Sequence, residues 1–179
     1  MLATISATLF TAMVLAVGYW SLGLATMLLF TTGFFTGLVL FLLRPGVVPF
    51  RAVRWPFFIS LALFALHRVE EYLADFFETL AAITGVPTPD VASPPVVMLV
   101  VLSVGAWLLV PFLMGRTRFG TYLAWTFFAA MGVTELAHVV LFPIIVGRPF
   151  EYFPGMASVF LLAPAGWWGL VTMWRRARP

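Results

Sequence analysis

Apolar residues fill most of this chain, in long runs separated by short segments that hold most of the charged residues. The first 43 residues carry no charge at all. One helix of that length would run roughly 64 Å, about twice the hydrocarbon core of a bilayer. We therefore expect a turn within 18–23, where Gly18 and Gly23 flank interfacial aromatic residues. The alternative is one long tilted helix with an extramembrane end.

The remaining apolar runs predict four further spans. Arg44, Pro45 and Gly46 end the second run, and Pro56 suits the first turn of the next helix. A proline-rich loop at 84–95 and short arginine-containing loops separate the others. The predicted fold is all-α, one domain over 1–179 with a bundle of six transmembrane helices, and five helices is the alternative. The expected spans are 2–18, 23–43, 56–79, 96–114, 120–146 and 154–174.

Composition agrees with an integral, multi-pass membrane protein in contact with the lipid bilayer. The chain is 63% hydrophobic and only 9% charged, whereas a soluble domain carries about 25% charged residues. The absence of cysteine excludes disulfides, thiolate metal sites and a cysteine nucleophile. The net charge of +3 does not indicate a nucleic-acid partner, because the arginines stand singly or in short clusters between apolar runs.

The arginines instead predict topology. Eight of the ten basic residues fall in the segments 44–55 and 115–119 and in the C-terminal tail, whereas the loop 84–95 holds none. Cytoplasmic loops carry the excess of basic residues in membrane proteins. With six spans, both termini are then cytoplasmic. The short loops and exclusive use of arginine fit a bacterial inner membrane.

Four ionisable side chains interrupt the third apolar run. His67, Arg68, Glu70 and Glu71 lie within five positions in the middle of the span 56–79. The three charged residues would cost roughly 8–10 kcal/mol near the bilayer centre, and the apolar residues of the span return about 4–6 kcal/mol. The charged face of this helix is therefore expected to point into the bundle.

A second polar pair lies on the fifth predicted span. Glu135 and His138 are three residues apart, so both side chains share one helix face. Glu71 lies about 22 Å along its helix from Pro56, and Glu135 lies about 22 Å from Gly120. Both helices start on the cytoplasmic side in this topology. The two polar groups are therefore expected to meet at one depth.

Three interpretations of this cluster differ in chemistry. The leading one is a mononuclear or dinuclear site for iron, manganese or zinc, because imidazole and carboxylate ligands suit these metals. It would support redox or hydrolytic chemistry on a lipid-soluble small molecule, with Arg68 balancing charge or orienting the substrate. The expected metal ligands are His67, Glu70, Glu71, Glu135 and His138, and the expected catalytic residues are His67, Arg68, Glu70 and Glu71.

The second interpretation is a cofactor-free isomerase or hydrophobic-ligand binder that uses His/Glu acid–base chemistry. A proton-coupled transporter is a related alternative, in which the carboxylates carry protons. The third interpretation is structural: Arg68 pairs with Glu71 or Glu135, and the other side chains form interhelical hydrogen bonds. Asp75 and Glu78 are expected to be solvated at the membrane interface. Gly33 and Gly37, four residues apart, predict a close helix contact.

The stretch His67-Arg68-Val69-Glu70-Glu71, followed by His138 on a later helix, resembles the HXXEE-domain family of small multi-span membrane proteins. The resemblance would cover most of the chain. It implies that His67, Glu70 and Glu71 are the key residues, and it implies little about the substrate.

Overall fold

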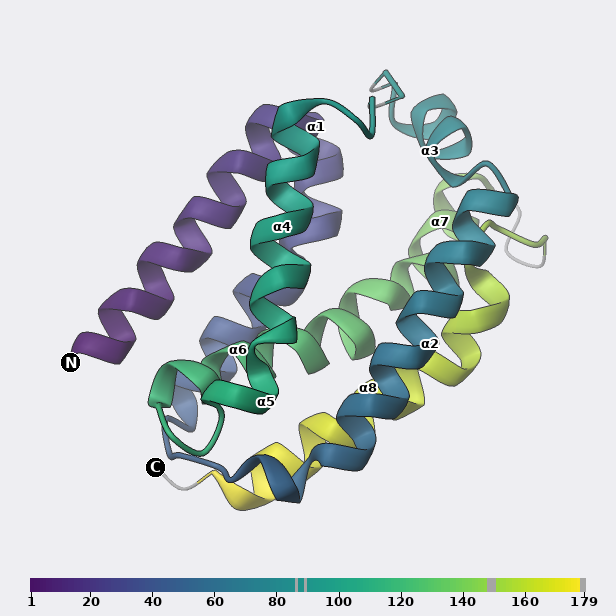
Figure 1. Cartoon of the computed structure of the whole chain (residues 1–179). Helices are drawn as coiled ribbons and strands as arrows, with labels where there is room; N and C mark the ends of the chain where they lie inside the picture. The colour runs from purple at the N-terminus through teal and green to yellow at the C-terminus, as the bar shows by residue number, and fades with distance from the viewer. Residues whose placement is uncertain (86, 89, 148–150, 178–179) are drawn as a thin grey trace.

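The computed structural model describes residues 1–85, 87–88, 90–147 and 151–177, and this part of the chain is helical without any β-strand (Figure 1). The predicted all-α fold is confirmed. The elements are α1 (Leu2–Leu43), η1 (Phe50–Ala52), α2 (Arg54–Leu73), α3 (Phe76–Thr84), α4 (Pro94–Leu108), α5 (Val110–Leu113), α6 (Arg118–Ala129), η2 (Ala130–Thr134), η3 (Glu135–His138), α7 (Leu141–Ile145) and α8 (Met156–Arg176).

Element α1 is a helical hairpin rather than one straight helix. Gly23 has φ 71° and ψ 174°, a conformation that glycine adopts without steric cost, and the chain reverses there. The two arms pack antiparallel, since Phe10 contacts Phe34 and a Cβ on Gly18 would lie 3.1 Å from Met27. The turn lies inside the expected segment 18–23, although the first arm continues past residue 18 up to the turn.

Two predicted spans are broken. The span predicted at 56–79 ends as α2 at Leu73, and Asp75 adopts a left-handed conformation with φ 52° before α3 begins. Aspartate is one of the few residues that tolerate this conformation. The span predicted at 96–114 ends as α4 at Leu108. Pro111 has no N–H to donate to the carbonyl four residues earlier, so the helix turns and continues as the short α5.

The fifth predicted span, 120–146, is also not one α-helix. The regular α6 passes into the π-helical turn η2, then into the 3₁₀ turn η3 and finally into α7. This irregular stretch lies between α1 and α8. A Cβ on Gly33 would lie 2.6 Å from the backbone of Ala130, and one on Gly166 would lie 2.6 Å from the nitrogen of Gly132.

The α6 helix forms the centre of the bundle. Every residue from Gly120 to Ala129 is buried, and none of them carries a charge. A Cβ on Gly37 would lie 2.4 Å from the backbone of Thr126, so α6 approaches α1 closely along the Gly33–Gly37 face. The close contact predicted for these two glycines is present. It fixes the start of η2, and hence the position of Glu135.

The basic segments meet at one end of the molecule. Arg118 donates to the carbonyl of Pro45 over 2.9 Å, and the guanidinium of Arg44 lies 4.5 Å from the ring centroid of Trp174. The N-terminal arm belongs to this end as well, because the hydroxyls of Thr11 and Tyr122 lie 2.7 Å apart. Figure 1 places both chain termini on the same side, away from α3 and α7. Asp75 and Glu78 are exposed at the opposite end.

Among the described residues, three helical segments are long and apolar enough to cross a membrane. They are Leu2–Leu24, Arg118–Ile145 and Met156–Arg176, and shorter apolar helices cover Met27–Leu43 and Pro94–Leu108.

Candidate metal centre

Four side chains from two distant stretches of the chain, three of them buried and the fourth largely so, meet around one point. His67 and Glu71 come from α2, and Glu135 and His138 come from η3. The Nε2 atom of His67 lies 3.4 Å from Oε1 of Glu71 and 3.1 Å from Oε2 of Glu135. The Nε2 atom of His138 lies 3.4 Å from each of the same two oxygens. The predicted meeting of the two polar pairs is therefore present.

The α2 pair, His67 and Glu71, depends on regular α-helical spacing. Residues four apart lie one above the other on the same face, and this face of α2 is buried. His67 is completely buried and Glu71 is 2% exposed. Packing of Phe57 against Phe127, with ring centroids 4.7 Å apart, fixes α2 beside α6 two to three turns before the site. The two segments therefore run in the same direction towards the cluster.

The η3 pair, Glu135 and His138, depends on a different spacing. In a 3₁₀ helix the side chains at i and i+3 eclipse, so Glu135 and His138 point the same way. The π turn between α6 and η3 changes the direction of this part of the chain and interrupts the regular pattern of its backbone hydrogen bonds. The indole N–H of Trp167 on α8 donates to the carbonyl of Gly132 over 2.6 Å. A neighbouring helix thus stabilises the irregular turn.

Hydrogen bonds on the far side of both imidazoles orient their Nε2 atoms. His138 can only donate from Nδ1 to the carbonyl of Pro154, 2.6 Å away. The Nδ1 of His67 lies 2.8 Å from the hydroxyl of Ser158, which itself donates to the carbonyl of Gly155 over 3.2 Å. The Ser158 oxygen is therefore the acceptor for His67. When the rings are neutral, the proton is therefore on Nδ1, and the Nε2 lone pair faces the cluster.

Gly155 leaves room for both rings. It has φ +87°, and a Cβ there would lie 2.6 Å from Nδ1 of His138 and 2.7 Å from Cε1 of His67. The backbone that supplies carbonyls to this hydrogen-bond network therefore approaches the imidazoles more closely than any other residue type would allow. Gly155 is required both by its conformation and by its neighbours.

Glu70 does not join the cluster. Its carboxylate accepts hydrogen bonds from the hydroxyl of Tyr152 and from the backbone N–H groups of Ala157 and Ser158, at 2.7–3.0 Å. The physical reason is the helical spacing, since residue i+3 from His67 lies on the flank of α2 that faces α8. Glu70 caps the N-terminus of α8, which is a favourable place for a carboxylate. The expected role of Glu70 as a metal ligand does not fit this geometry.

Tyr152 lies in the loop before α8. Partial burial, together with the neighbouring Glu70 carboxylate, raises the pKa of Tyr152 to about 12. Its hydroxyl is therefore protonated at neutral pH and donates to Glu70. This contact and the two backbone donors keep α2 and the start of α8 together, next to the Ser158 hydroxyl that orients His67.

Arg68 lies beside the cluster and forms an ion pair with Oε2 of Glu71. Its guanidinium carbon is 5.9 Å from the ring centroid of Phe77, and its side chain is 36% exposed. The predicted proximity of Arg68 to the site is therefore present. The pairing leaves Oε1 of Glu71 directed towards the two imidazoles.

The arrangement has the features of an ion-binding site. Within the described part of the chain, Nε2 of His67 and both oxygens of Glu71 are buried without a hydrogen-bond partner, and only ion pairs reach them. Two imidazole lone pairs that face two carboxylates repel them unless a cation or added protons lie between. A tetrahedral ion with bonds of about 2.05 Å holds its ligands about 3.3 Å apart. Four of the six ligand–ligand separations, the N···O distances of 3.1 to 3.4 Å, match that spacing, and all four ligand atoms lie within 4.8 Å of one another.

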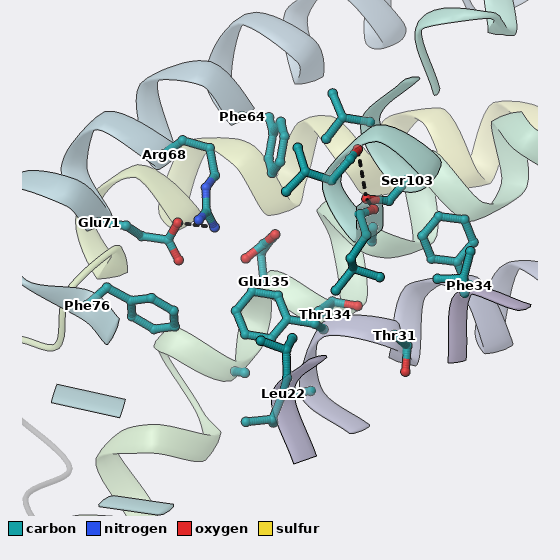
Figure 2. A pocket seen from close by; sticks show the side chains of 18 of the residues that line it. Leu22, Thr31, Phe34, Phe64, Arg68, Glu71, Phe76, Ser103, Thr134 and Glu135 are labelled. Carbon is teal, nitrogen blue, oxygen red and sulfur yellow. Dashed lines mark hydrogen bonds and ion pairs between the residues drawn. The ribbon is translucent and has the colours of Figure 1, made fainter. Parts of the chain in front are cut away.

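A cavity of about 320 Å³ opens onto the cluster. Glu71, Glu135 and His138 lie in its wall, together with Arg68 and Thr134. Figure 2 shows the carboxylates of Glu71 and Glu135 and the Arg68 guanidinium at one side of this space, with aromatic rings around the rest. The cavity extends between α4 on one side and α2 and α3 on the other. Its aromatic lining consists of Phe30, Phe34, Phe64, Phe76, Phe77, Phe142 and Trp107.

Three supporting groups were not identified from the sequence: the Ser158 hydroxyl, the Pro154 carbonyl and the Gly155 backbone. A serine and a backbone carbonyl carry no chemical signature of a site. The only signal in the sequence is the pair Pro154-Gly155 at the start of the last apolar run. It indicates a turn next to a helix start, without indicating what the turn contacts.

Comparison of the chain with protein-family models, with curated proteins and with solved structures gave no match.

Proposed function

We propose that this is an integral membrane protein with an intramembrane site for one divalent metal ion, held by His67, Glu71, Glu135 and His138. The observation that carries the proposal is the orientation of the two imidazoles. Each has its Nδ1 engaged by an oxygen behind it, and each directs Nε2 at the same two carboxylate oxygens. Metal-binding histidines typically have such a partner on the other ring nitrogen.

Two imidazoles and two carboxylates suit iron, manganese or zinc. The four ligand atoms surround one centre, which favours a mononuclear site. Glu135 is 12% exposed and, with Glu71 and His138, lies in the cavity wall, so a molecule in the cavity would reach the ion. A bound ion of this kind polarises an oxygen of the substrate or activates water. We therefore propose redox or hydrolytic chemistry on a lipid-soluble substrate that occupies the apolar cavity.

We further propose that the chain crosses the membrane six times, with the basic end and both termini in the cytoplasm. The pairing of Arg68 with Glu71, and of Glu70 with the start of α8, supports a membrane location for α2 despite its charges. The natural absence of cysteine allows a direct test. Single Arg51→Cys and Asp90→Cys variants are expected to react with a membrane-impermeant thiol reagent from opposite sides. Labelling of both from one side would contradict this topology.

The decisive experiment for the metal site is elemental analysis of the purified, full-length protein. We expect nearly one equivalent of iron, manganese or zinc in the wild type and background levels in His67→Ala. Glu78→Gln is the matched control, since Glu78 is an exposed acid on α3 outside the cluster. Wild-type protein that contains no metal after expression in metal-supplemented medium would refute the proposal.

A cofactor-free acid–base site is the second candidate, and the charge of the cluster favours it. Two imidazolium ions would balance Glu71 and Glu135 as well as one divalent cation does. This site would move protons on a hydrophobic substrate, as an isomerase does. It predicts metal-free protein with a co-purifying lipid, and loss of turnover in Glu71→Gln. The resemblance to the HXXEE-domain family stays a prediction under either candidate.

A further inference from the structure

The charges on the cavity wall do not cancel. Glu71 and Glu135 carry two negative charges, which the proposed divalent ion would offset, and Arg68 then adds one positive charge that nothing else in the wall balances. The same balance holds when two protons on the imidazoles replace the ion. Glu70 does not alter it, because that carboxylate lies outside the wall and caps the N-terminus of α8.

Arg68 has donors left for a ligand. A guanidinium carries five N–H groups, and one of its terminal nitrogens, Nη1, pairs with Glu71. Within the described residues, the other contact of Arg68 is with the face of the Phe77 ring. A ring face does not accept hydrogen bonds from N–H groups that point outwards in the plane of the guanidinium. Arg68 itself lines the cavity (Figure 2). A positive group with unused donors at the edge of an apolar space is complementary to an anionic head group.

The rest of the cavity suits a hydrocarbon tail. Its volume of about 320 Å³ lies at the small end of ligand pockets, which favours one chain over the two chains of a phospholipid. Phe34 stacks on Trp107 with ring centroids 5.4 Å apart, and Phe30 stacks on Phe77 at 6.3 Å. These rings give the tail rigid apolar walls.

We propose, building on the site described above, that the cavity binds a single-chain amphiphile with a carboxylate head group. The carboxylate contacts Arg68 beside the His/Glu cluster, and the tail lies among the aromatic rings towards α4. This places the carbon atoms next to the head group nearest to the cluster, where any chemistry on the ligand would occur.

The test measures binding of three twelve-carbon probes to the full-length protein in non-ionic detergent. The probes are dodecanoate, dodecan-1-ol and dodecylamine, which share a tail and differ in head-group charge. We expect dodecanoate to bind about tenfold or more tightly than the alcohol, since a hydrogen bond to a charged group is worth that factor. The amine is expected to bind most weakly. Equal affinity for dodecanoate and dodecanol in the wild type would overturn the proposal.

Variants locate the two parts of the ligand. Arg68→Gln is expected to remove the preference for dodecanoate over dodecanol, and Arg68→Lys is expected to restore part of it. Arg54→Gln, at the exposed start of the same helix, should leave the preference unchanged. A preference that survives in Arg68→Gln would exclude the assigned head-group contact. The comparison of probes on the wild type decides the case should Arg68→Gln not fold.

The tail is tested separately with Val104→Trp, which fills the cavity from α4. All three probes should then bind more weakly, by about tenfold or more, because a buried side chain occupies their place. Val101→Trp is the matched control, since Val101 is 63% exposed on the same helix. Unchanged binding in Val104→Trp would show that the tail lies elsewhere.

The outcomes separate this inference from the metal proposal. Metal-free protein that still prefers dodecanoate would refute the metal site and support the carboxylate ligand. Protein with one equivalent of metal and no preference among the probes would support the metal site and refute the carboxylate ligand. Metal content and probe affinity are therefore measured on the same preparation.

Discussion

The α2 pair and the η3 pair present the same two chemical groups through different backbone geometries. His67 and Glu71 are four residues apart on a regular α-helix, and Glu135 and His138 are three residues apart on a 3₁₀ turn. Each spacing is the one at which its own helix type aligns side chains. The regular half takes its backbone spacing from an ordinary α-helix. The irregular half depends on its neighbours, through the Trp167 hydrogen bond and the close contacts at Gly132.

The largest expected difference in metal affinity is between substitutions of Glu70 and Glu71, the two adjacent glutamates of α2. Glu71→Gln removes a ligand and the partner of Arg68, so we expect metal affinity to fall by more than about 100-fold, beyond the usual effect of an outer-shell change. Glu70→Gln keeps the ligands. The new side-chain NH₂ would face a backbone N–H of α8 that now donates to Glu70, and the start of α8 with Ser158 would be held less firmly. We therefore expect metal affinity to fall by about tenfold.

Isothermal titration of the metal-depleted proteins measures both effects. The order of the two variants is the informative result. A larger loss for Glu70→Gln than for Glu71→Gln would mean that the wrong glutamate has been assigned to the cluster.

Gly155 supports both pairs at once, since it contacts His67 and His138. Gly155→Ala is expected to lower thermal stability, because a non-glycine residue at positive φ costs about 1–3 kcal/mol. It should also weaken metal binding, because the new methyl group would displace both imidazoles. Gly85→Ala is the control. Gly85 has φ +69° and open space around it, so an alanine there introduces the same backbone strain without displacing any neighbouring side chain. Equal metal affinity in the two variants would show that Gly155 has no specific role at the site.

The smallest effect concerns the support of the irregular half. Trp167→Phe removes the donor to the Gly132 carbonyl, and we expect a loss of about 1–2 kcal/mol in the free energy of unfolding. Trp168→Phe, at the neighbouring and half-exposed position, should change it by about 0.5 kcal/mol or less. Thermal or denaturant unfolding in detergent measures both. If the two substitutions cost the same, the irregular turn does not depend on this hydrogen bond.

Much of the site could be predicted because its ligands are costly in an apolar environment. The charges of α2 required partners, and equal helical depth identified Glu135 and His138 as those partners. The choice between Glu70 and Glu71 could not be made in the same way, since i+3 and i+4 lie on one broad face of an α-helix. Only the position of α8, which offers its backbone N–H groups to Glu70, distinguishes them.

The helix breaks show a similar division. The turn at Gly23 was predictable from two glycines and from a length that exceeds the bilayer. The break at Asp75 follows the charged stretch of α2, and the break at Leu109 lies two residues before Pro111, but the hydrophobic pattern around each is compatible with one helix or two. The π and 3₁₀ turns at 130–138 could not be predicted either, because the hydrophobic pattern does not distinguish them from a regular α-helix. They arise from close packing against α1 and α8, which is a tertiary effect.

X-ray absorption spectroscopy at the edge of the bound metal tests the central claim most directly, because it detects the ligands themselves. We expect four nitrogen or oxygen ligands at about 2.0–2.1 Å from zinc. Multiple scattering should indicate two imidazoles, and one imidazole should be lost in His138→Ala. A bound ion without histidine ligands, or a spectrum unchanged by His138→Ala, would contradict the assignment of the metal to the α2 and η3 pairs.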